Sequence, residues 1–270
     1  MKPLFALAVI TFKEGIRSRA MYGISIFALL LMIANVLLSS MMMQEVGKVA
    51  VDMALSTVSF VGLLLVFFVG INLVAKDLER KTIYMVLARP ISRSQYICGK
   101  FMGVIALIIV SVIIISLFAI TSIIILKSSY PMFFTRFSWL MLLLSLSFTT
   151  MSLIIVSAMS FFFASFSSTS FISLVLTIVS YLIGSSINGV KALLEIPHDI
   201  GERSSPIILY GVKIAYYVFP NLSLFDIKTQ AAHGLEIPVS YIFWTFSYGI
   251  VYTGIIITLA CCIFKKREFA

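Results

Sequence analysis

Six long apolar runs constrain this chain more than any other feature of its sequence. Each is about as long as the ~20 residues that an α-helix needs to cross about 30 Å of hydrocarbon, and none contains Lys, Arg, Asp, Glu or His. The runs cover residues 22–40, 53–75, 101–126, 137–164, 171–188 and 241–264. Because backbone groups in lipid have to be hydrogen-bonded within their own segment, each run is predicted to form a helix. The predicted fold class is all-α: a polytopic helical membrane protein with six transmembrane helices in a single domain, residues 1–270.

The composition excludes a soluble globular domain. Hydrophobic residues make up 61% of the chain and charged residues only 11%, whereas soluble domains are about half apolar and about a quarter charged. A chain of 270 residues cannot hide so much apolar surface in its own core, so lipid has to solvate most of it. The formal charge of +9 therefore indicates topology and contact with anionic membrane lipid, and no nucleic-acid partner is predicted.

The distribution of the charged residues predicts how the helices are oriented. With the N-terminus inside, the inner segments hold 13 Lys and Arg and 4 Asp and Glu, so they carry the whole net charge of +9. The outer segments hold 7 of each kind and are neutral. Because an excess of Lys and Arg marks the cytoplasmic side, both termini are predicted to be cytoplasmic, in a multi-pass protein of the inner membrane.

The N-terminal segment, residues 1–21, is predicted to contain an interfacial helix over residues 2–19. The apolar residues of one face recur at helical spacing, namely Phe5, Val9, Phe12 and Ile16. Lys13 and Arg17 lie one turn apart on another face, which is typical of a helix that lies in the membrane surface. The alternative is a simple cytoplasmic extension of the first span.

The extracytoplasmic segment, residues 189–240, contains a shorter apolar stretch at residues 206–219. At 14 residues this stretch is short for a span, and runs of this length are more often re-entrant or interfacial. Counting it as a span would also put the basic C-terminal residues outside. It is therefore predicted to be an outer re-entrant or interfacial helix before the last span.

The sequence holds no motif for catalysis, and the chain is predicted not to be an enzyme. The Gly-Lys pair at Gly99-Lys100 lacks the upstream glycine of a phosphate-binding loop,. His198 and His233 lie far apart in the sequence, and the three cysteines have no zinc-site spacing, so no metal and no cofactor are assigned to this chain,.

The spans contain no ionisable residue, which disfavours a proton-coupled carrier. Their polar residues are Asn35, Asn72 and Asn188, predicted as possible pathway residues, together with hydroxyl side chains concentrated at residues 145–186. Small hydroxyl residues in a membrane usually mark close helix packing. We therefore favour packing for these hydroxyls, with a hydrophilic pathway as the alternative.

The cytoplasmic connection at residues 76–100 is too long for a simple turn between helices. The apolar residues in its first half are spaced for one helix face, and that helix is predicted to end before Pro90, because the residue before a proline avoids the α region. Ser92 can cap a second helix, with Gln95 at the third position of a capping box. We predict two short amphipathic helices joined at Pro90, able to receive force from a soluble partner. An interfacial helix that only anchors the flanking spans is the alternative.

This connection carries an extended pattern: Glu79-x-x-Thr82, Leu87, Pro90-Ile91-Ser92-Arg93, Tyr96 and Gly99-Lys100. The pattern resembles the coupling loop of type-2 ABC transporter permeases. The chain departs from the family at Lys81, where the family usually has a glycine that permits a tight turn. The N-terminal helix, the six spans and the large outer segment agree with the same family, so the resemblance covers essentially the whole chain.

The resemblance implies a permease subunit of an ABC exporter, forming the translocation path as a homodimer or heterodimer. A separate ABC ATPase subunit would bind ATP and Mg and push on the coupling loop at residues 76–100. By analogy, Glu79 and Arg93 are expected to make polar contacts with that subunit, and Leu87 and Pro90 to form an apolar knob. Thr82 is expected to belong to the same coupling site, and the N-terminal helix to cradle the same partner.

Two other functions remain open. An ATP-independent channel or carrier could use hydroxyl and carbonyl oxygens along its path. A non-transporting membrane scaffold or sensor could bind a partner through the outer segment at residues 189–240. For a transporter, the polar residues of the spans suit a lipid-like, polysaccharide, peptide or ionic cargo about equally.

Overall fold

The computed structural model of the chain describes residues 2–42, 45–70, 72–73, 92–167, 169–195 and 218–266. These residues contain helices and no β-strand. In chain order the elements are α1 (Lys2–Ile16), α2 (Arg19–Met41), α3 (Val46–Leu65), the π-helical turn η1 (Val66–Gly70), α6 (Arg93–Ser129), η2 (Pro131–Phe134), α7 (Trp139–Phe166), α8 (Ser170–Glu195), η3 (Leu222–Phe225), α10 (Lys228–His233) and α11 (Val239–Lys266). Six helices are long and apolar enough to cross a membrane: α2, α3 with η1, α6, α7, α8 and α11. The predicted all-α class and the six predicted spans are confirmed.

Two of the spans begin well before the apolar runs that predicted them. α3 begins at Val46 rather than at residue 53, and α6 begins at Arg93 rather than at residue 101. Charged side chains ended the apolar runs in the sequence. A helix continues past such residues into the interfacial region, because its backbone stays hydrogen-bonded and long charged side chains reach water.

The start of α6 confirms one expectation and corrects another. The predicted capping box is present: the Gln95 backbone N–H donates to Ser92 Oγ over 3.2 Å, and the Ser92 N–H donates to Gln95 Oε1 over 3.1 Å,. The expectation of a separate short helix after Pro90 is wrong, because α6 runs without a break for 37 residues to Ser129. The cap starts the third span itself, since nothing after it interrupts the helical backbone.

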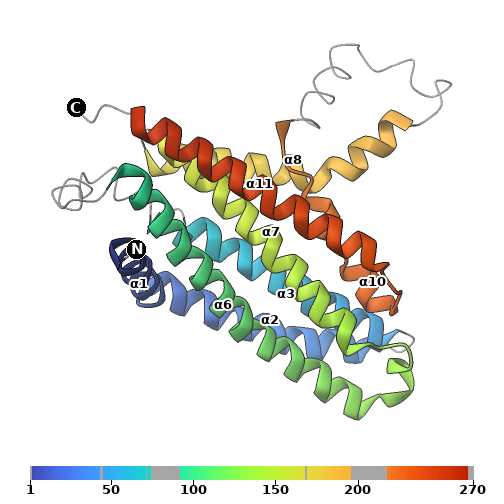
Figure 1. The fold of residues 1–270 in the computed structure, drawn as a ribbon. Helices are drawn as coiled ribbons and strands as arrows, with labels where there is room; N and C mark the ends of the chain where they lie inside the picture. Colours follow the sequence, from blue (N-terminus) through green and yellow to red (C-terminus); the bar gives the residue numbers. More distant parts are fainter. Residues whose placement is uncertain are drawn as a thin grey trace.

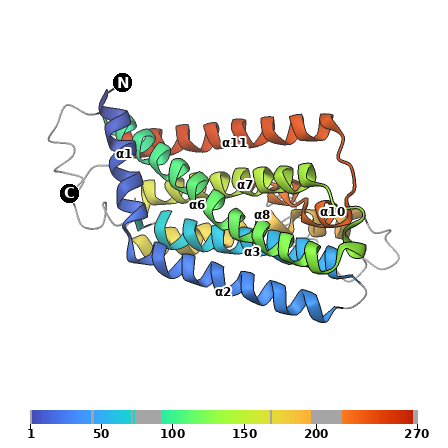
Figure 2. The same ribbon diagram turned by 90° about the horizontal axis from the view of Figure 1, so that it is seen from below.

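The long helices α2, α3, α6, α7 and α11 run side by side in a bundle, and α1 lies across one end of that bundle (Figures 1 and 2). The start of α1 and the end of α11 are at this end (Figure 1), as an even number of crossings requires. The described charged residues here are mostly basic: Lys13, Arg17, Arg19, Arg93, Lys100, Lys265 and Lys266, with Glu14. We call it the basic end. η2 and α10 lie at the opposite end (Figure 1).

The core of the bundle lies along α3, α6 and α7, which bury about half or more of their apolar windows. In α2, α8 and α11, most side chains of these windows are only partly buried or are exposed on the single chain. The large exposed side chains of α2 are apolar, among them Ile26, Leu30, Ile33 and Leu37. Such a surface is suited to lipid, where every backbone group has to be paired inside its helix.

α1 packs on α6 through a face different from its apolar stripe. Leu7 and Thr11 are buried against α6, whereas Phe5 is 70% exposed and Ile16 is also exposed. Phe5 and Ile16, at the two ends of the stripe, are therefore left free to enter the membrane surface, whereas Phe12 is partly buried against the core. The position of α1 across the bundle end fits the predicted interfacial helix (Figure 2),.

The described part of the outer segment folds back onto the spans. The predicted outer helix at residues 206–219 lies outside the described residues except for its last two positions. Beyond it, Tyr241 of α11 donates its hydroxyl to the Leu224 carbonyl of η3 over 2.7 Å, and Tyr248 accepts from the Asn221 backbone N–H over 2.9 Å. These bonds fix η3 on α11.

Candidate functional site

Four of the five predicted coupling residues, Glu79, Thr82, Leu87 and Pro90, lie outside the described residues. Their coupling role stays a prediction. The structure does place the chain on both sides of the segment that contains them. One side ends at Leu73 and the other begins at Ser92, and both are held by α6.

Arg93, the fifth predicted residue, is the first residue of α6. Its Nη1 donates to the Lys265 carbonyl oxygen, in the last turn of α11, over 3.1 Å. The last carbonyls of a helix have no partner within the helix, and a cation is favoured there by the helix dipole. Arg93 therefore ties the end of the predicted coupling segment to the basic end of α11.

Lys100 holds the other side of the segment. Its Nζ donates to the Leu73 carbonyl oxygen over 2.5 Å and lies 5.6 Å from the centre of the Tyr96 ring. Lys100 is only 4% exposed, and a buried ammonium is costly unless it is hydrogen-bonded. Lys100 was visible in the sequence as part of the Gly99-Lys100 pair, but its place in the coupling pattern did not by itself assign it a site role.

Aromatic packing also joins α6 to α11 at the basic end. Tyr96 of α6 and Phe264 of α11 are both fully buried, and their rings are stacked with centroids 6.1 Å apart. The ring contact lies one turn beyond Arg93 on α6, so α6 and α11 are joined by a polar contact and an apolar one at the basic end. A stacked aromatic pair contributes about 0.5–1.5 kcal/mol beyond its buried area.

α1 docks on the same turns of α6 through glycines. A Cβ atom on Gly103 would lie 2.6 Å from the Ala8 carbonyl oxygen and 2.7 Å from Thr11 Cβ, and one on Gly99 would lie 3.0 Å from Leu7 Cβ. Glycines spaced four residues apart let two helices approach closely. The first three turns of α6 thus carry α1, the end of α11 and both sides of the predicted coupling segment.

The three predicted pathway residues are not brought together. Asn35 is fully buried; its Nδ2 donates to the Ala50 carbonyl oxygen over 3.2 Å and to Ser122 Oγ over 3.4 Å, linking α2, α3 and α6. Asn72, near the basic end, donates to the Phe68 carbonyl. Asn188 is exposed on α8. Their role in a pathway stays a prediction.

A cavity of about 60 Å³ with a mixed polar and apolar lining lies near the middle of α3, α7 and α8 and reaches η3. Its hydroxyl lining comes from three spans and η3: Ser59, Thr149, Ser152, Tyr181, Ser185 and Ser223. Asp226 and Lys228, whose charged groups are 3.5 Å apart, complete the lining. Sequence analysis pointed to the hydroxyl-rich stretch at 145–186 but did not single out Ser59, which lies in another span.

The hydroxyls of the stretch at 145–186 lie in two different surroundings. Ser157, Ser160 and Thr177 are buried and donate to carbonyls three or four residues earlier in their own helices,. These hydroxyls allow close packing, as favoured from the sequence. Thr149, Ser152, Tyr181 and Ser185 instead face the cavity.

The family model of the ABC-2 family transporter proteins matches residues 5–269. The chain belongs to the ABC-2 transporter family. The match runs from α1 to α11, so the helix across the basic end is part of the same unit as the six spans. No individually curated protein matches the chain. This ABC-2 protein is a multi-pass membrane permease, which confirms the resemblance noted from the pattern at residues 79–100.

The junction of α6 and α11 in this ABC-2 permease can be tested by cross-linking. Cys98 Sγ and Cys261 Sγ are 3.8 Å apart, and both cysteines are free. A disulfide needs about 2 Å between sulfurs, so small side-chain rotations are enough to form it. We expect mild oxidation of the purified protein to give a Cys98–Cys261 linked peptide in non-reducing mass spectrometry. Cys262→Ser should leave this product unchanged and Cys98→Ser should remove it; a dominant link from Cys98 to Cys262 would contradict the register described for α6 and α11.

Proposed function

We propose that this chain is the membrane-spanning permease subunit of an ATP-binding cassette exporter, driven by a separate ATPase subunit that docks at the basic end. The observation that carries the proposal is the anchoring of both sides of the predicted coupling segment. Leu73 accepts a hydrogen bond from Lys100 of α6, and the other side continues directly into α6, whose first residue, Arg93, is bonded to Lys265 of α11. A push on that segment then acts on the longest helix of the bundle rather than on a loose connection.

α6 is suited to carry such a displacement through the membrane. Its 37 residues correspond to a length of about 55 Å at the usual rise per residue. It contacts α1, α2, α3, α7 and α11. Because packed helices move as rigid bodies rather than deform continuously, a shift at the first turns of α6 changes its packing along the whole bundle.

The side on which the partner docks follows from charge. The described residues of the basic end hold most of the Lys and Arg of the bundle's two ends with a single acid, Glu14. Lys and Arg accumulate on the cytoplasmic side of membrane proteins, and ATP is cytoplasmic. We infer an inner-membrane protein with both termini cytoplasmic, acting as a homodimer or heterodimer, with ATP and Mg bound by the partner subunit.

The hydroxyl-lined cavity is proposed as part of the translocation path. Hydroxyl groups from three spans line it near the middle of α3, α7 and α8, and the Asp226–Lys228 ion pair completes the lining. Hydroxyl groups can both donate and accept hydrogen bonds, so these side chains can replace the hydration of a polar cargo group.

The proposal predicts that Leu87→Asp and Glu79→Lys uncouple ATP hydrolysis from export. Burying a charge in an apolar contact, or reversing a polar one, weakens the push on the segment. We expect export by the reconstituted permease–ATPase complex to fall by about tenfold or more, the scale of losing ~1.4 kcal/mol or more of coupling, while the ATPase still hydrolyses ATP. Glu236→Lys, a charge reversal at an exposed position of the opposite end, is the matched control and should export normally.

Three results would contradict the proposal. Normal export by both coupling variants would remove the assigned coupling role. Cargo flux through the purified chain alone in liposomes, without ATP and without a partner, would identify an ATP-independent carrier instead. If no ABC ATPase encoded beside the gene for this chain co-purifies with it, the proposal that a separate ATPase subunit drives the permease would be contradicted.

A further inference from the structure

A second pocket, of about 350 Å³, opens at the opposite end of the bundle, far from the coupling segment. It is formed by the start of α3, by η2 with the segment that follows it, and by the end of α10. Its volume falls within the range of small-molecule sites in proteins, about 300–1,000 Å³. The proposed export function does not use this pocket.

Two glycines build the walls of the pocket. A Cβ on Gly47 would lie 2.1 Å from the Phe133 carbonyl oxygen, and one on Gly234 would lie 2.1 Å from the Arg136 carbonyl oxygen. Gly234 also has a φ of +64°, which favours glycine at this position,. These backbone contacts hold η2 and the next segment against α3 and α10, so the pocket is formed before any ligand arrives.

One side of the pocket is basic. Lys48, Arg136 and His233 line it, and no Asp or Glu is among its described lining residues. Lys48 Nζ forms an ion pair with Oε1 of Glu45, on the rim of the pocket, over 2.7 Å. This contact holds the pKa of the Glu45 carboxyl below its usual value. Arg136 is exposed and makes no ion pair within the described part of the chain. Its guanidinium is therefore available to a ligand.

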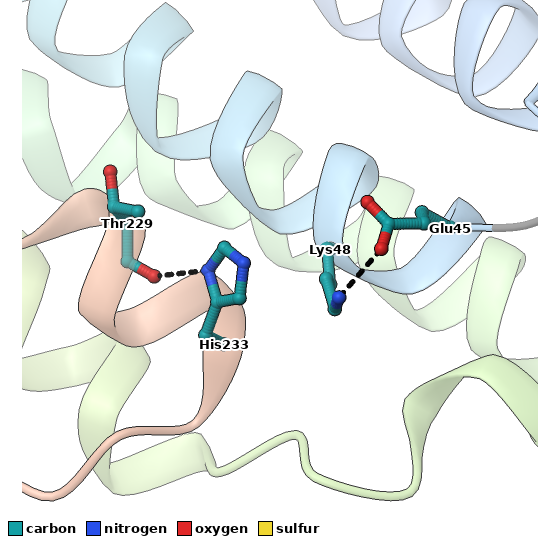
Figure 3. Close-up of polar contacts among 4 residues, drawn as sticks. All are labelled: Glu45, Lys48, Thr229 and His233. Atoms are coloured by element: carbon teal, nitrogen blue, oxygen red, sulfur yellow. Dashed lines mark hydrogen bonds and ion pairs between the residues drawn. The ribbon is translucent and has the colours of Figure 1, made fainter.

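His233 stands beside the Lys48–Glu45 pair, with its ring directed toward it (Figure 3). Its Nδ1 lies 2.9 Å from the Thr229 carbonyl oxygen. A carbonyl can only accept, so Nδ1 carries the hydrogen and Nε2 is left to face the pocket region. His233 also borders a neighbouring cavity of about 220 Å³ on whose wall Glu45 and Asp52 lie. Lys48 and His233 line both cavities, and the two acids lie in the lining of the neighbouring one only.

The rest of the pocket is apolar and lies at the edge of the spans. Phe133, Phe137 and Leu235 line it. Beside it, Lys127 Nζ lies 5.2 Å from the centre of the Phe137 ring and 5.6 Å from that of Trp139. Aromatic residues with a lysine are typical of the level of the lipid headgroups. The pocket therefore offers cationic groups and an apolar wall together, at the depth where a phosphate meets an acyl chain.

We propose that this pocket binds the phosphate of an anionic phospholipid, with the lipid's glycerol and upper acyl chain against the aromatic wall. Guanidinium groups match phosphate oxygens with paired hydrogen bonds, so Arg136 is the main determinant and Lys48 and His233 are secondary. An anionic amphiphile fits better than a zwitterionic one, because a choline group would have to lie against three basic side chains.

The test uses the fluorescence of Trp139, whose ring centroid lies 4.8 Å from that of Phe137 in the pocket wall. The chain has two tryptophans, so a Trp244→Phe background leaves Trp139 as the only reporter. Brominated phosphatidylglycerol and brominated phosphatidylcholine are titrated against the purified full chain in detergent. We expect phosphatidylglycerol to quench at about tenfold lower concentration, the scale of one charge-assisted hydrogen bond.

Arg136→Gln and Lys48→Gln should reduce this preference toward equality. The matched control is Lys228→Gln, which removes a lysine from the same helix as His233 but outside this pocket. It should keep the preference, and unchanged thermal unfolding of each variant shows that the fold is intact.

Three outcomes would overturn the proposal. The first is equal quenching by both lipids in the parent protein. The second is an equal loss of preference in Arg136→Gln and Lys228→Gln, which would indicate general surface charge. The third is complete displacement of the lipid by inorganic phosphate or soluble glycerol phosphate at the lipid's own concentration, which would assign the site to a free anion.

Discussion

Replacing Gly103 with leucine is expected to detach α1 from α6 and to abolish ATP-driven export. The added side chain would start 2.6 Å from the Ala8 carbonyl oxygen, which belongs to the backbone of α1 and cannot rotate away. Overpacking usually costs about 1–3 kcal/mol even where side chains can shift. Here the whole of α1 has to move, and α1 is the helix proposed to cradle the ATPase.

The detachment can be measured directly. In a background with the three native cysteines replaced by serine, Thr11→Cys places a thiol at a position that is only 1% exposed, against α6. A water-soluble maleimide should label this thiol slowly in the parent protein and many times faster in Gly103→Leu. Gly254→Leu is the matched control, since nothing lies within 4 Å of the added Cβ. Slow labelling and normal export in Gly103→Leu would refute the close packing of α1 on α6.

Replacing Lys100 with methionine is expected to leave the bundle folded while export falls close to background. Methionine has a similar length and no charge, so it can fill the same buried space. It cannot donate to the Leu73 carbonyl, and a hydrogen bond from a charged group contributes about 1.5–3 kcal/mol. The chain leading into the predicted coupling segment is then no longer fixed to α6, and a push on it is lost before it reaches the spans.

The decisive measurement is the ratio of cargo exported to ATP hydrolysed by the reconstituted complex. Lys100→Met should lower this ratio strongly while the ATPase subunit still co-purifies. Lys127→Met changes a lysine at the other end of the same helix, which packs over aromatic rings, and should keep the ratio. An unchanged ratio in Lys100→Met would show that the Lys100–Leu73 bond has no part in coupling.

The capping of α6 shows how far local sequence can predict structure. Ser92 and Gln95 are three residues apart, and the capping box depends only on groups within one helical turn, so a helix start at this position could be predicted,. The same local reasoning failed to see that this helix continues into the span. Charged and polar residues before residue 101 suggested a break, but backbone hydrogen bonds extend through them.

The contacts of Lys100 show where prediction from the sequence stops. A lysine beside a glycine at the start of a span is compatible with a headgroup contact, a substrate contact or a hydrogen bond to the chain. Which of these forms depends on how closely residues 73 and 100 approach in space. The hydroxyl-lined cavity could not be predicted from the sequence either, because Ser59, Thr149 and Tyr181 belong to three different spans.

Six helices, the shared end of both termini and the family pattern at residues 79–100 could all be predicted from the sequence. They follow from hydropathy, charge and short-range hydrogen bonding, which act within a segment. The convergence of α1, α11 and both sides of the coupling segment on α6 could not be predicted in this way, nor could the pocket that basic residues distant in the chain surround. Such contacts depend on the packing of helices against one another, and packing is a property of pairs of surfaces rather than of any single run of residues.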